Sequence, residues 1–150
     1  MTAWLIDASV FAASVLKDET VHPAAIRFLA EAQDVAGAAI IDCEVANALA
    51  KAVRRRRMAR AEAVRACRRF VEWPMPRTEL RPHLAESVER AGRGQGHPYD
   101  LVQVLTARGA GRRFVTIDDA LLRDLRGTDL ADVAIHLLDA VDRIRARPRP

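Results

Sequence analysis

Four acidic residues stand where their carboxylates could meet in a folded α/β domain. Asp7 and Asp118 each follow a short apolar run that is typical of a buried strand. Glu44 falls in the first turn of a predicted helix, and Asp100 stands at the start of another helix, after a glycine-rich loop. In a parallel sheet, ligands gather at the carboxyl ends of the strands, where the following helices begin. An oxygen-only group of this kind suits a hard cation such as Mg²⁺ or Mn²⁺.

Each acid taken alone also has a plain structural explanation. Asp7, Asp100 and Asp118 could cap helices, which is worth about 1 kcal/mol each. Glu44 could complement the dipole of its helix. Four carboxylates near one edge repel one another unless a cation lies between them. The capping explanation is therefore weaker for the set than for any single member.

The elements that must position these acids alternate along the chain. Apolar runs predict buried strands, and apolar residues at helical spacing predict helices between them. This alternation indicates a parallel sheet covered by helices on both faces. The arginine- and proline-rich end, about 143–150, is expected to fray. Strands are expected at 3–6, 35–39, 114–117 and 133–137, a short extended segment after 73–76, and helices at about 7–16, from 22, and at 40–57, 59–71, 82–92, 99–108 and 119–125.

Length and composition favour a soluble protein. The 150 residues suit a single domain, 1–150, and half of them are hydrophobic. No uncharged apolar stretch reaches the roughly 20 residues that a membrane span needs, and the first residues do not resemble a secretion signal. We therefore expect a cytoplasmic protein without a membrane partner. The two cysteines and four histidines are scattered, which disfavours a zinc site.

Basic residues are concentrated in one segment, which suggests a polyanionic partner. The segment 51–69 holds nine basic residues against one acid, a net charge of +8, whereas the whole chain carries +4. Some of the arginine could reflect a GC-rich genome, but a solvated helix face usually mixes signs. We therefore favour contact with nucleic-acid phosphates. The candidate RNA-binding residues are Lys51, Arg54, Arg55, Arg56, Arg57 and Arg60.

Four short motifs, taken in order, resemble the PIN domain, and most closely its VapC toxin branch. They are Leu5-Ile6-Asp7-Ala8-Ser9-Val10, Glu44-Val45-Ala46-Asn47-Ala48-Leu49, Tyr99-Asp100 and Thr116-Ile117-Asp118. The resemblance covers nearly the whole chain. It implies a three-layer α/β/α domain with a central, mostly parallel sheet and an acidic pocket that holds Mg²⁺ or Mn²⁺. The residues that match the family's metal-site and catalytic acids are Asp7, Glu44, Asp100 and Asp118, and those that match its supporting positions are Ser9, Asn47 and Thr116.

The resemblance also implies a function. It is that of a metal-dependent endoribonuclease, the toxin of a toxin–antitoxin pair, which hydrolyses loops of transfer or ribosomal RNA. A homodimer and a VapB-like antitoxin are the implied partners. The chain departs from the pattern at 101–104, where family members often have small and aromatic residues. Two acids rival the matched ones, and we expect both Asp42 and Asp119 to cap helices instead.

Other functions stay open. One is an RNA-maturation PIN nuclease that has no antitoxin, and another is a non-catalytic nucleic-acid-binding module in which the acids are only caps. An aspartyl phosphotransferase is disfavoured because Ser9 stands where a second acid is needed. A base-stacking platform is also disfavoured, since no predicted strand exposes a pair of aromatic residues. Recognition of an RNA loop by shape is the remaining expectation.

Overall fold

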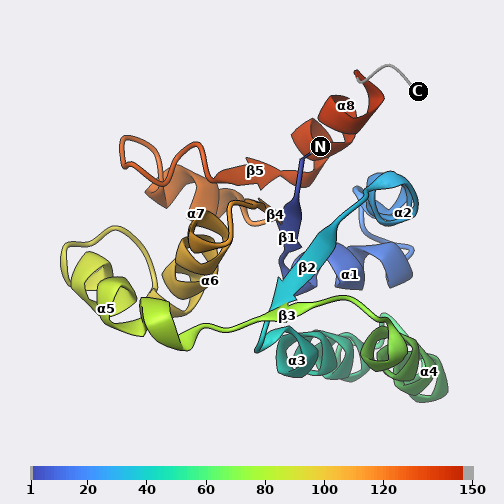
Figure 1. The fold of residues 1–150 in the computed structure, drawn as a ribbon. Coiled ribbons are helices and arrows are strands. Elements are labelled where there is room, and N and C mark those ends of the chain that lie inside the picture. The colour runs from blue at the N-terminus through green and yellow to red at the C-terminus, as the bar shows by residue number, and fades with distance from the viewer. Residues whose placement is uncertain (1, 147–150) are drawn as a thin grey trace.

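Five short strands form one parallel sheet in the computed structural model, which describes residues 2–146. The chain adds β2 and β3 on one side of β1, and then crosses to the other side for β4 and β5 (Figure 1). The spatial order β3-β2-β1-β4-β5 therefore reverses between β1 and β4, and ligands of open α/β sheets bind at such a reversal. The strands are β1 (Trp4–Ile6), β2 (Val35–Ala38), β3 (Arg77–Thr78), β4 (Arg113–Thr116) and β5 (Ala134–His136).

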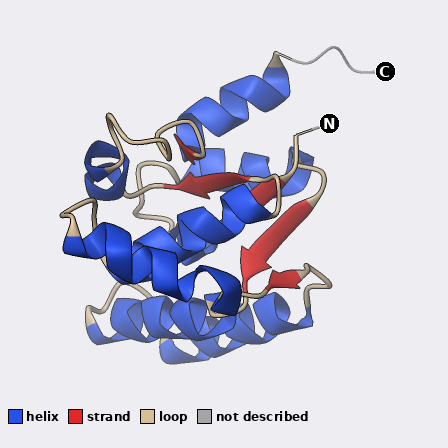
Figure 2. Ribbon diagram, turned by 60° about the vertical axis from the view of Figure 1, so that its left-hand side comes forward, coloured by secondary structure: helices blue, strands red, loops and turns tan. Residues whose placement is uncertain are grey.

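Helices cover both faces of this sheet, and Figure 2 shows the strands lying between them. In Figure 1, α5, α6 and α7 lie to the left of the strands, and α1 and α2 lie to the right. The helices are α1 (Ala8–Val15), α2 (His22–Glu31), α3 (Ile41–Arg54), α4 (Arg60–Glu72), α5 (Leu84–Gly92), α6 (Pro98–Gly109), α7 (Asp119–Asp124) and α8 (Leu137–Arg145), with a short 3₁₀ helix, η1 (Arg81–His83).

Side chains of each strand alternate between two hydrophobic cores. In β1, Trp4 and Ile6 pack with α1, α2, α3, α4 and α8, whereas Leu5 packs with α6 and α7. In β4, Val115 joins the first core and Phe114 the second. This two-residue period is what a sheet buried on both faces requires. The expected three-layer α/β/α arrangement with a parallel sheet is confirmed.

The C-terminal helix was not predicted. We expected fraying from Arg143, but α8 continues to Arg145. The reason lies in Leu137, Ala140, Val141 and Ile144, which follow the spacing of one helix face and pack against the first core. This burial outweighs the disordering influence of the arginines and prolines. Residues 147–150 of the expected tail lie outside the described residues.

α3 ends earlier than expected, at Arg54 rather than Arg57. Arg56 adopts a left-handed backbone with φ of 58°. The N–H of Arg56 bonds to the carbonyl of Val53, and the N–H of Arg57 bonds to that of Ala52. This pair of bonds is a Schellman motif, which satisfies the last carbonyls of a helix and reverses the chain. The turn separates the basic segment into the end of α3 and the start of α4.

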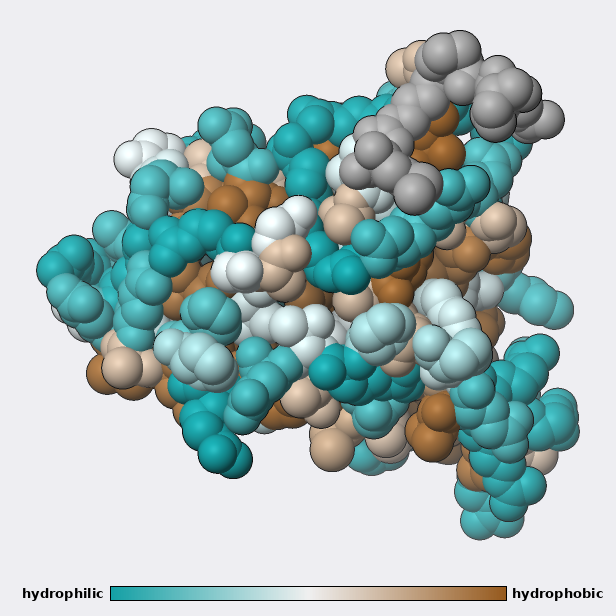
Figure 3. Space-filling view, viewed as in Figure 1, coloured by the Kyte–Doolittle hydropathy of each residue, from teal (hydrophilic) through white to brown (hydrophobic). Residues whose placement is uncertain are grey.

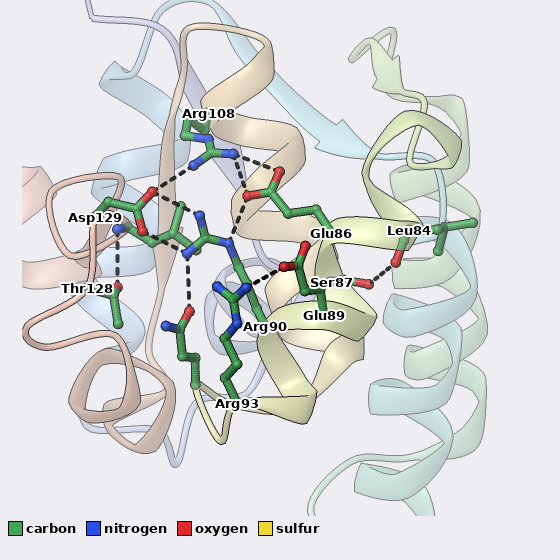
Figure 4. A network of polar contacts seen from close by, with 11 residues as sticks. Leu84, Glu86, Ser87, Glu89, Arg90, Arg93, Arg108, Thr128 and Asp129 are labelled. Atoms are coloured by element: carbon green, nitrogen blue, oxygen red, sulfur yellow. Dashed lines mark hydrogen bonds and ion pairs between the residues drawn. The ribbon is translucent and has the colours of Figure 1, made fainter.

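Arg90 and Arg108 tie α5 and α6 to the loop before β5 (Figure 4). Arg90 is largely buried and pairs with Asp129 at 2.7 Å and with Glu86 at 2.8 Å. Arg108 reaches the same two acids at 3.0 and 2.8 Å. The network joins three segments on the side of the sheet that carries α6. Within residues 2–146, no helix is both long and apolar enough to cross a membrane.

Candidate functional site

Asp7 follows β1 and stands at the N-cap position of α1, yet its side chain makes no capping hydrogen bond. Its Oδ2 instead accepts hydrogen bonds from the hydroxyl of Ser9 and, at 2.7 Å, from that of Thr116. Ser9 belongs to α1 and Thr116 to β4, so the carboxylate is held between the two strands where the sheet order reverses. The capping explanation therefore fails for Asp7.

Asp118 does cap a helix. Its Oδ1 accepts hydrogen bonds from the N–H groups of Ala120 and Leu121, at 2.8 and 3.1 Å. The expectation that Asp119 caps is wrong, because α7 begins at Asp119 and the cap is the residue before it. The N–H of Asp118 also donates to Thr116 Oγ1 at 3.0 Å. One hydroxyl thus connects Asp118 to Asp7.

Glu44, in the first turn of α3, meets Gln103 of α6. The Gln103 side chain is buried, and its Nε2 donates a hydrogen bond to Glu44 Oε1 at 3.0 Å. The other two oxygens of this pair, Glu44 Oε2 and Gln103 Oε1, are buried without a hydrogen-bond partner among residues 2–146. Burial and the nearby charge of Asp7 raise the pKa of Glu44 to about 7, although the bond from Gln103 opposes the shift.

Asp100 lies in the first turn of α6 and does not cap it. The cap is His97, whose Nδ1 accepts from the N–H of Tyr99 at 3.3 Å. Burial raises the pKa of Asp100, and the charges of Asp7 and Asp118 raise it further. The charges of Asp7 and Asp100 thus act on Glu44, and those of Asp7 and Asp118 act on Asp100, so electrostatic effects connect all four acids at the edge where β1 and β4 end.

Two residues near these acids were missed in the sequence. Asp124 of α7 adds to the shift that raises the pKa of Asp100, but its spacing from Asp118 matches no motif. Gln103 does carry a signal, because it stands three residues after Asp100, on the same side of a helix. It is also a polar residue inside the apolar run 101–105.

Two predicted residues do not join the acids. Asn47 is exposed, and within residues 2–146 its side chain makes no hydrogen bond, so the geometry gives it no supporting role. The expectation that Asp42 caps α3 is wrong, since Ile40 occupies the cap position. Asp42 instead pairs with Arg77 at 2.7 Å. That guanidinium also donates to the carbonyls of Phe70 and Trp73, so Asp42 belongs to the junction of α3, α4 and β3.

The donor set fits a hard divalent cation. It offers only oxygen atoms, and a cation would relieve both the repulsion that raises two pKa values and the lack of partners for two buried oxygens. Within residues 2–146, no three His, Cys, Asp or Glu side chains converge as a ready ligand set. Asp7, Glu44 and Asp118 each have one carboxylate oxygen bonded to protein donors, and the other oxygen has no hydrogen-bond partner in the described chain.

A cavity of about 190 Å³ opens beside the acids, between α1 and α3. We call it the α1–α3 groove. Ser9 and Ile117, which flank Asp7 and Asp118 in the chain, contribute to its lining. So do Lys51 of α3 and Arg55, the C-cap residue of that helix. They stand seven and eleven residues after Glu44 and therefore lie on the same side of the helix. The remaining lining residues are Ala12, Ala13, Leu16, Glu19, Ala48, Ala52 and Arg57.

Most cations of the basic segment are free to bind an anion. Lys51, Arg54, Arg55, Arg56 and Arg60 are exposed, and they form no ion pair within the described chain. Arg57 differs from them. It pairs with Asp18 at 2.7 Å and with Glu19 at 2.6 Å, so its charge is already matched. In Figure 3, hydrophilic side chains gather at the lower right, where Figure 1 places α4.

Comparison with known proteins supports the fold alone. No family model matches the chain, and no curated protein matches it. The solved structures that resemble it include PAE2754 from Pyrobaculum aerophilum, which is 24% identical with a TM-score of 0.72. The alignment covers 97% of this chain and 91% of that one. At this level of identity, the likeness shows a shared arrangement of helices and strands.

Proposed function

We propose that the chain is a Mg²⁺- or Mn²⁺-dependent endoribonuclease of the PIN-domain kind. The observation that carries the proposal is the gathering of Asp7, Glu44, Asp100 and Asp118 at the reversal of the strand order. They come from four separate segments, and burial and mutual repulsion raise the pKa of Glu44 and of Asp100. A protein has little structural reason to gather carboxylates that repel one another, whereas a divalent cation that assists phosphodiester hydrolysis is held by such carboxylates.

The surrounding residues have distinct tasks in this proposal. Asp7 and Asp118 would hold the cation directly, and Glu44 and Asp100 would bind it directly or through water. A bound Mg²⁺ or Mn²⁺ polarises a phosphate and lowers the pKa of a coordinated water. Ser9 and Thr116 fix the orientation of Asp7, as supporting hydroxyls do around acidic ligands.

Glu44 is suited to proton transfer. Its pKa of about 7 means that it can take up or release a proton at Oε2 under neutral conditions. Gln103 holds the other oxygen, so the orientation of the carboxyl group is fixed. Glu44 is accordingly our candidate to accept a proton from the attacking water.

The α1–α3 groove supplies a path for the RNA strand. The acids repel phosphate, so affinity must come from cations beside them. Lys51 and Arg55 lie on the same side of α3 as Glu44 and line the groove. Contacts of this kind are to phosphates and are insensitive to sequence, which predicts binding that weakens steeply with salt. The substrate is proposed to be structured RNA, in loops of transfer or ribosomal RNA.

The toxin role is the finer part of the proposal and comes from the motifs that resemble VapC. It requires a small VapB-like antitoxin, and a homodimer is the expected assembly. A gene for a short protein immediately upstream would be the expected source of the antitoxin. Expression of the chain alone should arrest growth, and co-expression with such a neighbouring gene should restore it. Arrest that is not relieved, or no arrest, would instead favour an RNA-maturation nuclease without an antitoxin.

A non-catalytic nucleic-acid-binding module is the second candidate. Two observations favour it: Asp118 does cap α7, and no three acidic or imidazole side chains of the described chain form a ready ligand set. Against it, Asp7 and Asp100 do not cap their helices. The two candidates differ in whether RNA is cut.

Cleavage of total RNA by the purified chain distinguishes them. The assay compares Mg²⁺, Mn²⁺ and EDTA, with Asp7→Asn as the inactive variant and Asp119→Asn as the matched control. We expect discrete fragments that need the metal, disappear in Asp7→Asn and persist in Asp119→Asn. RNA that is bound but never cut would reject the nuclease and leave the binding module.

A further inference from the structure

Tyr99 is an exposed aromatic residue in a chain that buries its others. The six Phe and Trp side chains all pack within or against the two cores, whereas Tyr99 is 52% exposed. Its ring has one aromatic neighbour within the described chain, the exposed His97, at 6.4 Å between centroids and 48° between planes. Among residues 2–146 its hydroxyl has no hydrogen-bond partner. Both rings are therefore accessible to solvent.

The position of Tyr99 connects it with the acids. It precedes Asp100 and stands four residues before Gln103, so Tyr99 and Gln103 lie on the same face of α6. Gln103 is buried and bonds to Glu44, and helical side chains tilt toward the N-terminus. Tyr99 therefore stands one helical turn outside the buried Gln103–Glu44 contact. The N–H of Asp100 donates a hydrogen bond to the backbone carbonyl of His97 at 3.1 Å, which places the second ring at the same edge.

The pair is held in place before any ligand arrives. Pro98 stands between the two residues at the start of α6 and fixes its own backbone. His97 Nδ1 accepts the N–H of Tyr99, which orients the imidazole against the first turn of the helix. The backbone of the pair and the imidazole therefore have little conformational freedom left to lose when a planar group settles against the rings.

The chemistry of the surroundings indicates what that planar group is. Cations of the α1–α3 groove can hold phosphates on the α3 side of the acids. On the α6 side, Asp100 and Asp124 repel phosphate, so a contact there must be with an uncharged part of the chain. Nucleic-acid bases are uncharged, and they stack on Tyr and His when they are not already stacked in a duplex.

We propose that Tyr99, with His97 beside it, forms a platform on which one unpaired RNA base stacks, next to the acidic site. The proposal rests on the proposed nuclease function and deepens it. A strand that crosses the acids is held by its phosphates at α3 and by a base at α6, so that the phosphate to be cut lies between. The sequence did not predict this pair, because stacking residues were expected on a strand, whereas His97 and Tyr99 lie at the start of α6.

Fluorine NMR tests the contact directly. Tyr99 is the single tyrosine, so the chain grown with 3-fluorotyrosine gives one protein resonance. Asp7→Asn is used so that RNA is not cut. Titration with single-stranded oligoadenylate should shift the resonance. An abasic oligonucleotide with the same backbone should bind on the order of tenfold more weakly and leave the resonance in place. Equal affinity for the two, an unmoved resonance, or no binding of either would overturn the platform.

Variants separate this proposal from the function it rests on. With an unstructured RNA substrate, Tyr99→Leu should raise KM on the order of tenfold and leave kcat nearly unchanged, and Tyr99→Phe should restore most of the loss. Val88→Ala, which alters an exposed apolar residue of α5, is the matched control and should have no effect. An unchanged KM in Tyr99→Leu would reject the platform while leaving the nuclease intact. Absence of cleavage by the unaltered chain would reject the nuclease, and the fluorine titration would still decide the platform.

Discussion

The side-chain amide of Gln103 donates a hydrogen bond from Nε2 to Glu44 Oε1 at 3.0 Å and so connects α6 to α3. The two residues are 59 positions apart in the sequence. Each retains one buried oxygen without a partner in the described chain. A buried polar atom of this kind is costly unless something else binds it. We take the pair as the structural basis of the proposed proton transfer and cation binding.

Removal of the Gln103 amide should change the pH at which the enzyme works. The bond favours the charged form of Glu44 and opposes the rise in its pKa. In Gln103→Met, the pKa of Glu44 should therefore lie above its present value of about 7, so that less of the carboxylate is ionised at neutral pH. The acid limb of the pH–rate profile should move to higher pH, with activity recovered in alkaline buffer. A profile that falls uniformly at all pH values would contradict the proton-transfer role of Glu44.

Without metal, stability should decrease as the pH rises toward neutrality. The folded pKa of Glu44 is raised from about 4.5 to about 7, and that of Asp100 is raised as well. Both groups therefore stabilise the fold fully below their unfolded pKa values. The contribution of Glu44 is lost as the pH rises through its folded pKa of about 7, and that of Asp100 is lost as the pH rises through its own raised pKa. Thermal melts in EDTA should give a Tm that falls between pH 5 and pH 7 more in the unaltered chain than in Glu44→Gln. Addition of Mn²⁺ should reverse this decrease in Tm. An equal pH dependence of the Tm in the two proteins would contradict the raised pKa of Glu44.

Substitutions of Asp118 should separate its helix-capping role from its proposed role in hydrolysis. Asn caps a helix about as well as Asp, so Asp118→Asn should keep the Tm but lose cleavage. Asp118→Ala should lose cleavage and also about 1 kcal/mol of stability. Asp119→Asn is the control. It should retain both the Tm and the cleavage activity, since Asp119 is not among the charges that raise the pKa of Asp100. Cleavage retained by Asp118→Asn would mean that the residue is only a cap.

Two neighbouring arginines should contribute unequally to RNA binding. Arg55 is exposed and forms no ion pair in the described chain, whereas Arg57 is paired with Asp18 and Glu19. Arg55→Gln should weaken binding of unrelated RNAs alike and reduce the slope of log K against log salt by about 0.7 to 0.9. Arg57→Gln should change the slope less. Equal slopes for the two variants, measured by filter binding over a salt series, would show that ion pairing does not decide the path of the RNA.

Much of the fold could be predicted because its signals are local. The apolar runs before Asp7 and Asp118 predict β1 and β4, and the helical spacing of apolar residues predicts the helices between them. α8 was missed because its apolar face, ending at Ile144, is followed directly by an arginine- and proline-rich sequence. The strand order cannot be derived from such local patterns, since it depends on which runs pair.

The details of the site depended on contacts that are distant in sequence. Asp42 does not join the four acids because its side chain pairs with Arg77, which is 35 residues away in the sequence. Asp119 does not hold the capping position, because α7 already begins at Asp119 and its cap is Asp118, one residue earlier than expected. Composition does not fix helix boundaries to that accuracy. Gln103 and Asp124 approach the acids because α6 and α7 share one core, which no single motif encodes.

Calorimetric titration of the chain with Mn²⁺ tests most directly whether the four acids form a cation site. The titration uses the unaltered protein, Asp7→Asn and the control Asp119→Asn, all shown to be folded by their melting curves. We predict saturable binding to the unaltered protein and to Asp119→Asn, with binding lost or greatly weakened in Asp7→Asn. Absence of binding to all three, or equal binding to Asp7→Asn, would contradict the metal site and with it the proposed nuclease.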